Sequence, residues 1–179
     1  MKKLLNNIVE AQFGANVSGK QSGDYPCIQG RDFDASGEYL SLEPLYVDEV
    51  DMKYTQFLRK GDVLFSTKGK IFASVWQDQM INAVATGTFL ILKVKDKSIT
   101  PEYLAMYLNS SKAKKYYDLH IKTATVSHIG KKQLELLEIE IPPIEKQNLL
   151  VSVHKLMGEE KKLTSELQNR KEKILNYLI

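Results

Sequence analysis

The sequence predicts an α/β (α+β) globular domain over residues 1–142, followed by one long coiled-coil helix over residues 143–179. In the first part, short runs rich in β-formers alternate with turn residues and with segments whose apolar residues have helical spacing. After Pro142-Pro143 the chain contains no further proline and one glycine, Gly158. With 179 residues, of which 43% are apolar, the chain is long enough for one such domain and one extended appendage.

The strands are predicted from short β-rich runs that are bounded by turn residues. Segment 14–25 is rich in Gly, Ser and Asn and predicts a loop, and residues 35–39 predict a turn. The predicted strands are PCIQ before Gly30, residues 44–50, VLFST after Gly61-Asp62, IFASVW, and residues 88–95. The tripeptide Lys68-Gly69-Lys70 separates VLFST from IFASVW, which predicts a β-hairpin with glycine at its tip.

A helix is predicted to begin after Thr100, because this residue can cap it while Pro101 and the acidic Glu102 suit its first turn. Its apolar face is expected to join the core and consists of Tyr103, Leu104, Tyr107 and Leu108. The rest of the domain predicts a second helix over 111–119, a polar loop with extended character over 120–130, a helical turn over 131–136 and the short strand EIEIP.

The final helix carries apolar residues at heptad spacing. Heptad position a is occupied by Leu149, Leu156, Leu163, Arg170 and Tyr177. Heptad position d is occupied by Val153, Glu160, Leu167 and Ile174. Seven of these nine residues are apolar or aromatic, as in a coiled coil. At about 1.5 Å per residue the helix is roughly 55 Å long, too long to bury this stripe against its own domain. We therefore expect a partner helix to pack against Leu149, Val153, Leu156, Leu163, Leu167 and Ile174.

Composition and charge exclude several classes of protein. A single cysteine, Cys27, excludes an internal disulfide framework and zinc sites with several cysteines, and it fits a reducing compartment. No apolar run reaches the roughly 18 residues that span a membrane, and the first residues lack a signal-peptide pattern, so we expect a cytoplasmic protein with no membrane partner. Residues 52–142 hold fourteen basic and eight acidic side chains, against four and nine in residues 1–51. The middle of the chain is therefore expected to face a polyanion.

Motifs for catalysis are missing from the sequence. It contains no Walker A motif, GxSxG, HExxH or GxGxxG, and neither of the methyltransferase signatures, a Gly-rich cofactor loop and an Asn/Asp-Pro-Pro-aromatic tetrapeptide. The histidines are not at metal-binding spacing; they are His120, His128 and His154. One acidic cluster leaves open a metal-dependent nuclease, although a solvated loop is favoured: Asp32, Asp34, Glu38, Glu43, Asp48, Glu49 and Asp51. We expect no catalytic residue, metal or cofactor.

Three polar stretches have the composition of nucleic-acid contacts, namely residues 18–22, 66–70 and 122–128. A hairpin tip is narrow enough to enter a groove, and its ammonium and hydroxyl groups can bond phosphates or base edges. For phosphate or groove contact we predict Lys20, Lys68, Lys70, Lys122 and Lys132. For base-edge readout we predict Gln21, Ser66, Thr67, Thr125, Ser127 and His128. A solvent-exposed loop is the alternative for each stretch. The aromatic residues are expected to pack rather than to stack on bases, in particular Tyr116, Tyr117 and Trp76.

Several of these pieces occur in the order seen in one protein family. They are PCIQGRDFD, GDVLFSTKGK, TPEYLAMYLNSSKAKKYY, TATVSHIGKKQLELLEIEIPPIEKQ and the amphipathic helix that follows. The whole chain resembles a specificity subunit of a Type I restriction-modification system. LELLEIEIPPIEKQNLLV is the most specific piece, similar to the family's end-of-domain strand, its Pro-Pro turn, a Glu-x-Gln and the start of its coupling helix. The resemblance implies a domain that reads double-stranded DNA and a helix that supports DNA methyltransferase subunits and, where present, a restriction subunit.

Members of that family usually carry two recognition domains and two helices, whereas this sequence has one of each. The resemblance therefore implies a half-length form. We expect a homodimer that is joined by antiparallel helices and reads a bipartite palindromic site, with pairing to a different half-subunit as the alternative. Three other possibilities stay open: a protein-interaction module with a structural coiled coil, a small metal-dependent nuclease, and a fragment or inactive remnant of a modification enzyme.

Overall fold

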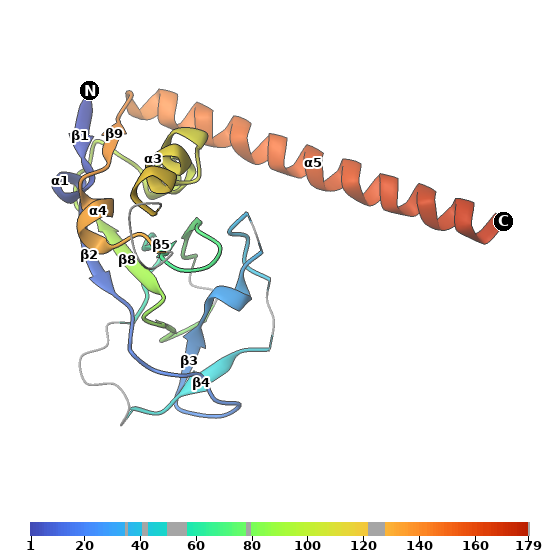
Figure 1. Cartoon of the computed structure of the whole chain (residues 1–179), viewed down its shortest axis with the longest axis horizontal. Coiled ribbons are helices and arrows are strands. Elements are labelled where there is room, and N and C mark those ends of the chain that lie inside the picture. Colours follow the sequence, from blue (N-terminus) through green and yellow to red (C-terminus); the bar gives the residue numbers. More distant parts are fainter. Residues whose placement is uncertain (35, 41–42, 50–56, 78–79, 122–127, 179) are drawn as a thin grey trace.

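The computed structural model shows a domain of mixed strands and helices from which one long helix projects (Figure 1). It describes residues 1–34, 36–40, 43–49, 57–77, 80–121 and 128–178. The long helix is α5 (Ile144–Leu178). The predicted fold class, an α/β domain followed by a long helix, is confirmed.

The centre of the domain is an antiparallel sheet with the order β2-β8-β5-β6 among the described residues. Its strands are β2 (Val9–Phe13), β8 (Phe89–Val94), β5 (Val63–Ser66) and β6 (Ala73–Val75). β5 and β6 pair with Phe65 opposite Ala73, which confirms the predicted hairpin. β2 pairs with β8 along its whole length, although the sequence patterns gave no strand in this first segment.

Two smaller sheets flank the central one. β3 (Tyr25–Ile28) pairs antiparallel with β4 (Leu45–Val47) and parallel with the two-residue β7 (Val84–Ala85). β1 (Lys2–Leu4) pairs with β9 (Glu138–Glu140) from the other end of the domain. Between β1 and β2 lies the short helix α1 (Leu5–Ile8). Strands β3, β4 and β9 confirm sequence predictions, whereas β1, β7 and α1 were not predicted.

The helices of the domain follow the sequence signals closely. They are α2 (Pro101–Leu108), α3 (Ser111–Ile121) and α4 (Lys131–Glu135). The Thr100 hydroxyl oxygen accepts a hydrogen bond from the N–H of Tyr103 at 3.2 Å, which confirms the predicted cap. The predicted core face of α2 is buried, and the hydroxyls of Tyr103 and Tyr107 donate to carbonyl oxygens of β9. Within the described residues, no helix has the length and apolar composition that crossing a membrane requires.

The central sheet is covered by apolar side chains on both faces. Successive residues of β5 alternate between two buried clusters: Val63 and Phe65 face α2 and α3, whereas Leu64 joins the cluster that contains Phe33, Phe72 and Trp76. The second cluster lies beneath the candidate site.

The aromatic residues that were expected to pack do so. Tyr117 is buried against Phe65, with ring centroids 5.4 Å apart, and its hydroxyl donates to the carbonyl of Leu108. Burial raises the pKa of the Tyr117 hydroxyl. The Tyr116 hydroxyl donates to the carbonyl of Gln133, and Trp76 is buried in the second cluster.

Helix α5 is attached to the domain by its first turn. The Gln147 side chain is fully buried there, and its oxygen accepts a hydrogen bond from the N–H of Thr100 at 3.0 Å. Its Nε2 donates to the carbonyls of Ser98 and Pro142 at 2.7 and 2.8 Å. Farther along, an exposed ion pair of 3.6 Å joins Lys162 to Glu38 of the domain.

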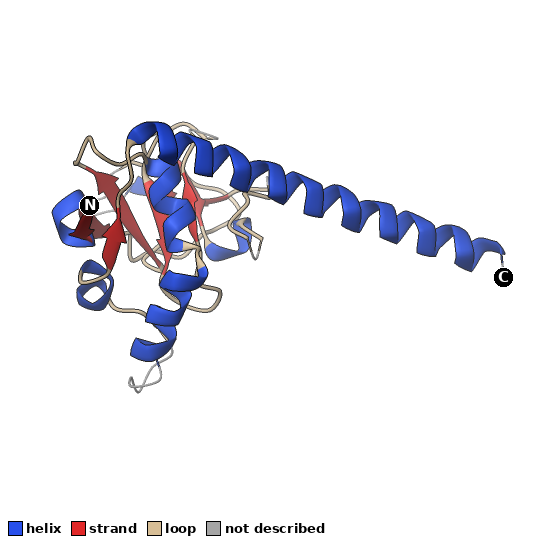
Figure 2. Cartoon of the chain, turned by 90° about the horizontal axis from the view of Figure 1, so that it is seen from above, coloured by secondary structure: helices blue, strands red, loops and turns tan. Residues whose placement is uncertain are grey.

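The rest of α5 extends well past the domain (Figure 2). Six stripe residues are between 45% and 66% exposed: Leu149, Val153, Leu156, Leu163, Leu167 and Ile174. The helix therefore leaves these side chains uncovered by its own domain, in agreement with the expectation from its length.

Candidate nucleic-acid interface

The tip of the β5–β6 hairpin presents two cations on a compact turn. Lys68, Gly69 and Lys70 are all exposed. Gly69 has a φ of +70°, a conformation that favours glycine, and a Cβ at this position would meet nothing within 4 Å. The tip is therefore narrow and open, as predicted for an element that enters a groove.

The two hydroxyl residues just before the tip have a different environment from the one expected. Ser66 and Thr67 are each 3% exposed. The Ser66 hydroxyl donates to the carbonyl of Lys68 at 3.2 Å, and the Thr67 hydroxyl donates to the carbonyl of Thr88 at 2.8 Å. Both groups therefore stabilise the base of the hairpin. Their placement does not support the expected readout of bases, because a buried hydroxyl that is bonded within the protein does not reach a base edge.

Two of the three predicted contact stretches meet at two described residues, Lys68 and His128. Lys68 pairs with His128 across an isolated antiparallel bridge, and the N–H of Ile129 donates to the carbonyl of Thr67 at 3.3 Å. Ile129 is fully buried and so anchors this segment in the core. Half-buried His128 therefore lies beside the hairpin tip. Three predicted residues fall outside the described residues: Lys122, Thr125 and Ser127.

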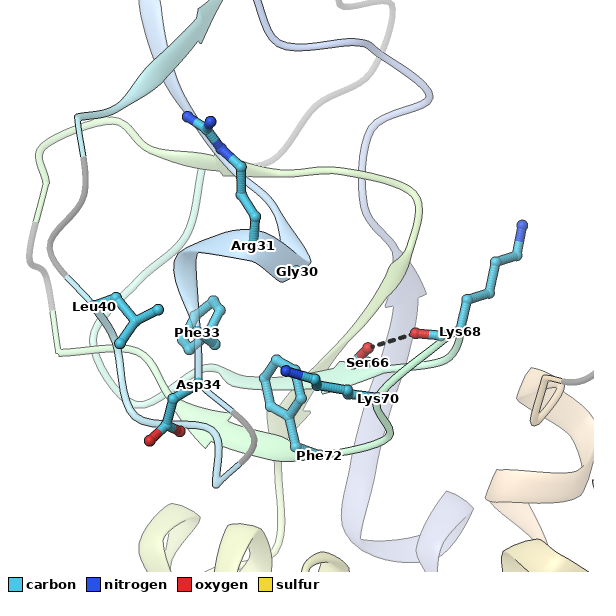
Figure 3. A pocket seen from close by; sticks show the side chains of 9 residues that line it. All are labelled: Gly30, Arg31, Phe33, Asp34, Leu40, Ser66, Lys68, Lys70 and Phe72. Carbon is cyan, nitrogen blue, oxygen red and sulfur yellow. Dashed lines mark hydrogen bonds between the residues drawn. The ribbon is translucent and has the colours of Figure 1, made fainter. Parts of the chain in front are cut away.

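A cleft of about 580 Å³ opens beside the hairpin tip (Figure 3). Its lining, called the basic cleft below, comprises Gly30, Arg31, Phe33, Asp34, Leu40, Ser66, Lys68, Lys70 and Phe72. The cations come from two elements: Lys68 and Lys70 from the hairpin and Arg31 from the turn after β3. The ends of Arg31 and Lys68 point away from the two phenylalanines, toward the outside of the cleft. Lys132, which was predicted from the third stretch, is exposed on α4 and is not part of this lining.

The acidic side chain in the basic cleft is engaged by its own loop. The Asp34 carboxylate accepts hydrogen bonds from the hydroxyl and N–H of Ser36 and from the N–H of Glu38, at 2.7 to 2.9 Å. Burial acts to raise the pKa of Asp34, but these hydrogen bonds outweigh it and hold the pKa below its usual value. The negative charge is thus balanced by donors within the loop, and the three cations set the character of the cleft.

Arg31 was not among the predicted site residues. It lies in the 3₁₀ turn η1 (Gly30–Asp32), directly after β3. Its Nε lies 3.6 Å from Oδ1 of Asp32, and its Nη2 donates to the carbonyl of Glu43 at 3.2 Å. The sequence signal that could have identified Arg31 is the tripeptide Gly-Arg-Asp, which places a cation in a turn at the end of a predicted strand.

The first predicted stretch lies beside Arg31. A second hollow, called the polar hollow below, is lined by Gln21, Arg31, Glu43, Pro44 and Leu45. Gln21 is exposed. The neighbouring Lys20 forms an ion pair of 2.6 Å with Asp48, so its ammonium already has a protein partner. Arg31 therefore joins the basic cleft to the polar hollow.

The acidic residues of the sequence cluster have separate partners. Asp32 is buried and accepts a hydrogen bond from the N–H of Gln29 at 2.7 Å, Asp34 bonds its own loop, and Asp48 pairs with Lys20. In the part of the chain that the structure describes, which leaves out Asp51, no group of three or more His, Cys, Asp or Glu residues is placed to hold a metal ion.

The chain matches one family model, that of the Type I restriction modification DNA specificity domain, over residues 9–172. A search of curated proteins found no match.

Solved structures with a similar fold come from the same type of system. One belongs to a study of complex assembly and conformational transition of the type I R-M system, with a TM-score of 0.72, 19% identity, and coverage of 99% of this chain and 43% of that chain. The HsdS subunit from Thermoanaerobacter tengcongensis has a TM-score of 0.59 and 19% identity, and the match covers 89% of this chain and 37% of that chain. The S subunit from M. genitalium has a TM-score of 0.50 and 15% identity, and the match covers 92% of this chain and 42% of that chain. The chain thus spans less than half the length of these proteins.

Proposed function

Because the chain belongs to the family of Type I restriction modification DNA specificity domains, we propose that it binds double-stranded DNA at a specific sequence. The observation that supports this proposal most is that three cations from two separate elements line one cleft, beside the paired Lys68 and His128. Such a surface suits a polyanion, and a hairpin tip with a cation on either side of Gly69 suits entry into a groove.

Two kinds of contact are proposed on this surface. Lys68 and Lys70 contact phosphates, which supplies affinity and makes it salt-dependent. Polar groups on the rim, among them His128 and Gln21, contact base edges. Lys20, Lys122, Thr125, Ser127 and Lys132 remain predicted contacts, although Lys20 must give up its ion pair with Asp48 to bind a phosphate.

Helix α5 is proposed to join two recognition domains. Its exposed apolar side chains need a partner, and a second copy of α5 in antiparallel orientation covers them while placing one domain at each end. The dimer then reads a bipartite palindromic site with a spacer that neither domain contacts. Pairing with a different half-subunit gives an asymmetric site instead.

The chain is proposed to direct chemistry rather than perform it. DNA methyltransferase subunits, and a restriction subunit where one is present, dock on α5 and supply the cofactor, the metal ions and the reacting groups. On this proposal no side chain of the chain itself is catalytic.

The proposal is tested by selecting DNA from a random pool with the full chain, alone and together with its methyltransferase subunit. We expect one bipartite sequence to be enriched and its dissociation constant to rise steeply with salt. Recovery of no common sequence overturns specific binding. Salt-independent capture of protein without DNA supports the interaction module instead, and metal-dependent cleavage by the chain alone supports the nuclease.

A further inference from the structure

The guanidinium group of Arg31 is supported on one side and open on the other. The contacts with Asp32 and Glu43 engage Nε and one hydrogen of Nη2. An arginine has five N–H donors in a planar fork, so within the described residues these contacts leave both N–H groups of Nη1 and one of Nη2 for a ligand. In Figure 3 this end of the side chain points away from Phe33 and Phe72.

The groups that support Arg31 are themselves fixed. The carboxylate of Asp32 is buried and accepts a hydrogen bond from the N–H of Gln29, which closes a capping box on the turn η1. The carbonyl of Asp32 accepts a hydrogen bond from the N–H of Leu40 at 2.8 Å. A side chain held by such contacts loses little freedom on binding, which is a requirement for accurate recognition.

The loop that carries Gln21 is also held in place next to Arg31. Lys20 and Tyr46 exchange two backbone hydrogen bonds of 2.8 Å. A Cβ on Gly19 would lie 2.4 Å from Nε2 of Gln29 and 2.7 Å from Cβ of Leu45, so the loop touches this part of the domain. The polar hollow is therefore a defined surface, with an amide and a guanidinium on its rim.

The position of Arg31 between two surfaces suggests its role. It shares the basic cleft with Lys68 and Lys70, the proposed phosphate contacts, and the polar hollow with Gln21. A contact that only places charge near phosphates tolerates several orientations of a side chain, whereas recognition of a base edge requires one defined orientation of the donors. The supported fork and its open edge have the geometry of a bidentate donor.

We propose that Arg31 is a specificity-determining residue that reads a guanine in the major groove, an assignment that rests on the proposed DNA-binding function. Its Nη1 and Nη2 donate to O6 and N7 of the guanine, while Asp32 and the carbonyl of Glu43 hold the fork in place. Asp32 is a positioning residue, because it acts through Arg31 and does not touch the DNA.

The test uses the full chain and the DNA sequence that it selects, with affinities measured by fluorescence anisotropy. Arg31→Ala is expected to lower the affinity for this sequence by about 5- to 150-fold, the range of one bidentate contact, and to make one G·C position tolerant of other base pairs. Lys70→Ala is the matched control from the same cleft. It is expected to weaken all sequences alike and to reduce the salt slope by about 0.9.

Base analogues at the tolerant position identify the atoms that are read. 7-Deazaguanine lacks the N7 acceptor and is expected to weaken binding by the wild-type chain but not by Arg31→Ala. Inosine keeps O6 and N7 and loses only the minor-groove amino group, so it is expected to bind the wild-type chain nearly as well as guanine. Asp32→Asn keeps the arginine but weakens its support, and it is expected to lose part of the discrimination.

Three results overturn the assignment while leaving the proposed DNA-binding function in place. If Arg31→Ala and Arg31→Lys weaken binding to all sequences alike, Arg31 contacts a phosphate and not a base. If both variants bind with unchanged affinity, Arg31 does not contact the DNA. Sensitivity to inosine but not to 7-deazaguanine moves the contact to the minor groove. If the wild-type chain selects no sequence, the proposed function fails together with this assignment. Thermal unfolding of the Arg31 variants is expected to show an intact fold, because the Arg31 side chain is 49% exposed. The same measurement on Asp32→Asn separates a loss of stability from a loss of discrimination.

Discussion

Lys68 at the tip of the hairpin pairs through its backbone with His128, a residue that follows α3. This pairing brings together two residues that are distant in the sequence, beside the basic cleft. The backbone of His128 thereby supports one side of the tip, and the next residue, Ile129, is buried in the core.

Removing the charge of Lys68 is expected to weaken binding to every DNA sequence by a similar factor. Each phosphate contact that is lost reduces the slope of log affinity against log salt concentration by about 0.9. Anisotropy titrations of Lys68→Ala at several salt concentrations measure this slope. Lys97→Ala, an exposed lysine outside the basic cleft, is the control and is expected to change nothing. An unchanged affinity and slope for Lys68→Ala contradict the proposed role of the tip.

Thr67→Val is expected to lower stability without changing the preference for bases. The substitution removes the hydroxyl that donates to the carbonyl of Thr88, at a site that is 3% exposed. The lost buried hydrogen bond costs about 1–2 kcal/mol of the free energy of unfolding, as measured by urea denaturation. Normal stability together with an altered sequence preference would show instead that Thr67 contacts a base, as the sequence predicts.

Leu163→Lys is expected to prevent association of the chain in solution. The leucine is 66% exposed on α5, so a lysine is tolerated by the domain but places a charge in the proposed apolar seam. Light scattering of the wild-type chain is expected to give about twice 20.4 kDa, and the variant is expected to give a mass near 20.4 kDa. A wild-type mass near 20.4 kDa at all concentrations contradicts the homodimer and leaves a different partner for α5.

Acid is expected to weaken the attachment of β1 through Asp96. Its carboxylate pairs with Lys3 at 2.5 Å and accepts a hydrogen bond from the N–H of Ser98, and these contacts, that with Lys3 foremost, lower its pKa to about 2. A carboxyl whose pKa is lower in the folded chain stabilises it above the unfolded pKa of about 3.9. That contribution is lost as the pH falls from about 4 toward 2.

Asp96→Asn tests this contribution by urea denaturation at pH 7 and at pH 2. The variant is expected to lose no more than about 1 kcal/mol at pH 7, because the pair is partly exposed, and to differ much less from the wild-type chain at pH 2, where Asp96 is about half protonated. An equal difference at both pH values contradicts a charge-dependent role.

Local signals account for the parts of the fold that the sequence predicts correctly. The Thr100-Pro101 start of α2 and the glycine tip of the β5–β6 hairpin each depend on neighbours in the chain. Strand β1 was missed because its three residues become a strand only by pairing with β9, at the far end of the domain. The two-residue β7 likewise depends on β3. Short strands of this kind have no periodic pattern that the sequence alone reveals.

The same reasoning explains the candidate site. Lys68 and Lys70 are found from the sequence because a hairpin tip projects into solvent by its own geometry. The burial of Ser66 and Thr67 is not evident from the sequence, because it depends on a sheet that is covered on both faces and buries polar residues at the ends of its strands as well as apolar ones. Arg31 is significant only through its position next to two hollows, which depends on how separate loops meet.

The buried amide of Gln147 fixes the angle at which the long helix α5 leaves the domain. An α5 of 35 residues extends about 52 Å, so a tilt of about 10° at its first turn displaces the far end by about 9 Å. That displacement exceeds the rise of two base pairs of DNA, which is about 7 Å. In the proposed dimer the distance between the two half-sites therefore depends on the geometry at Gln147, far from the residues that are proposed to contact bases.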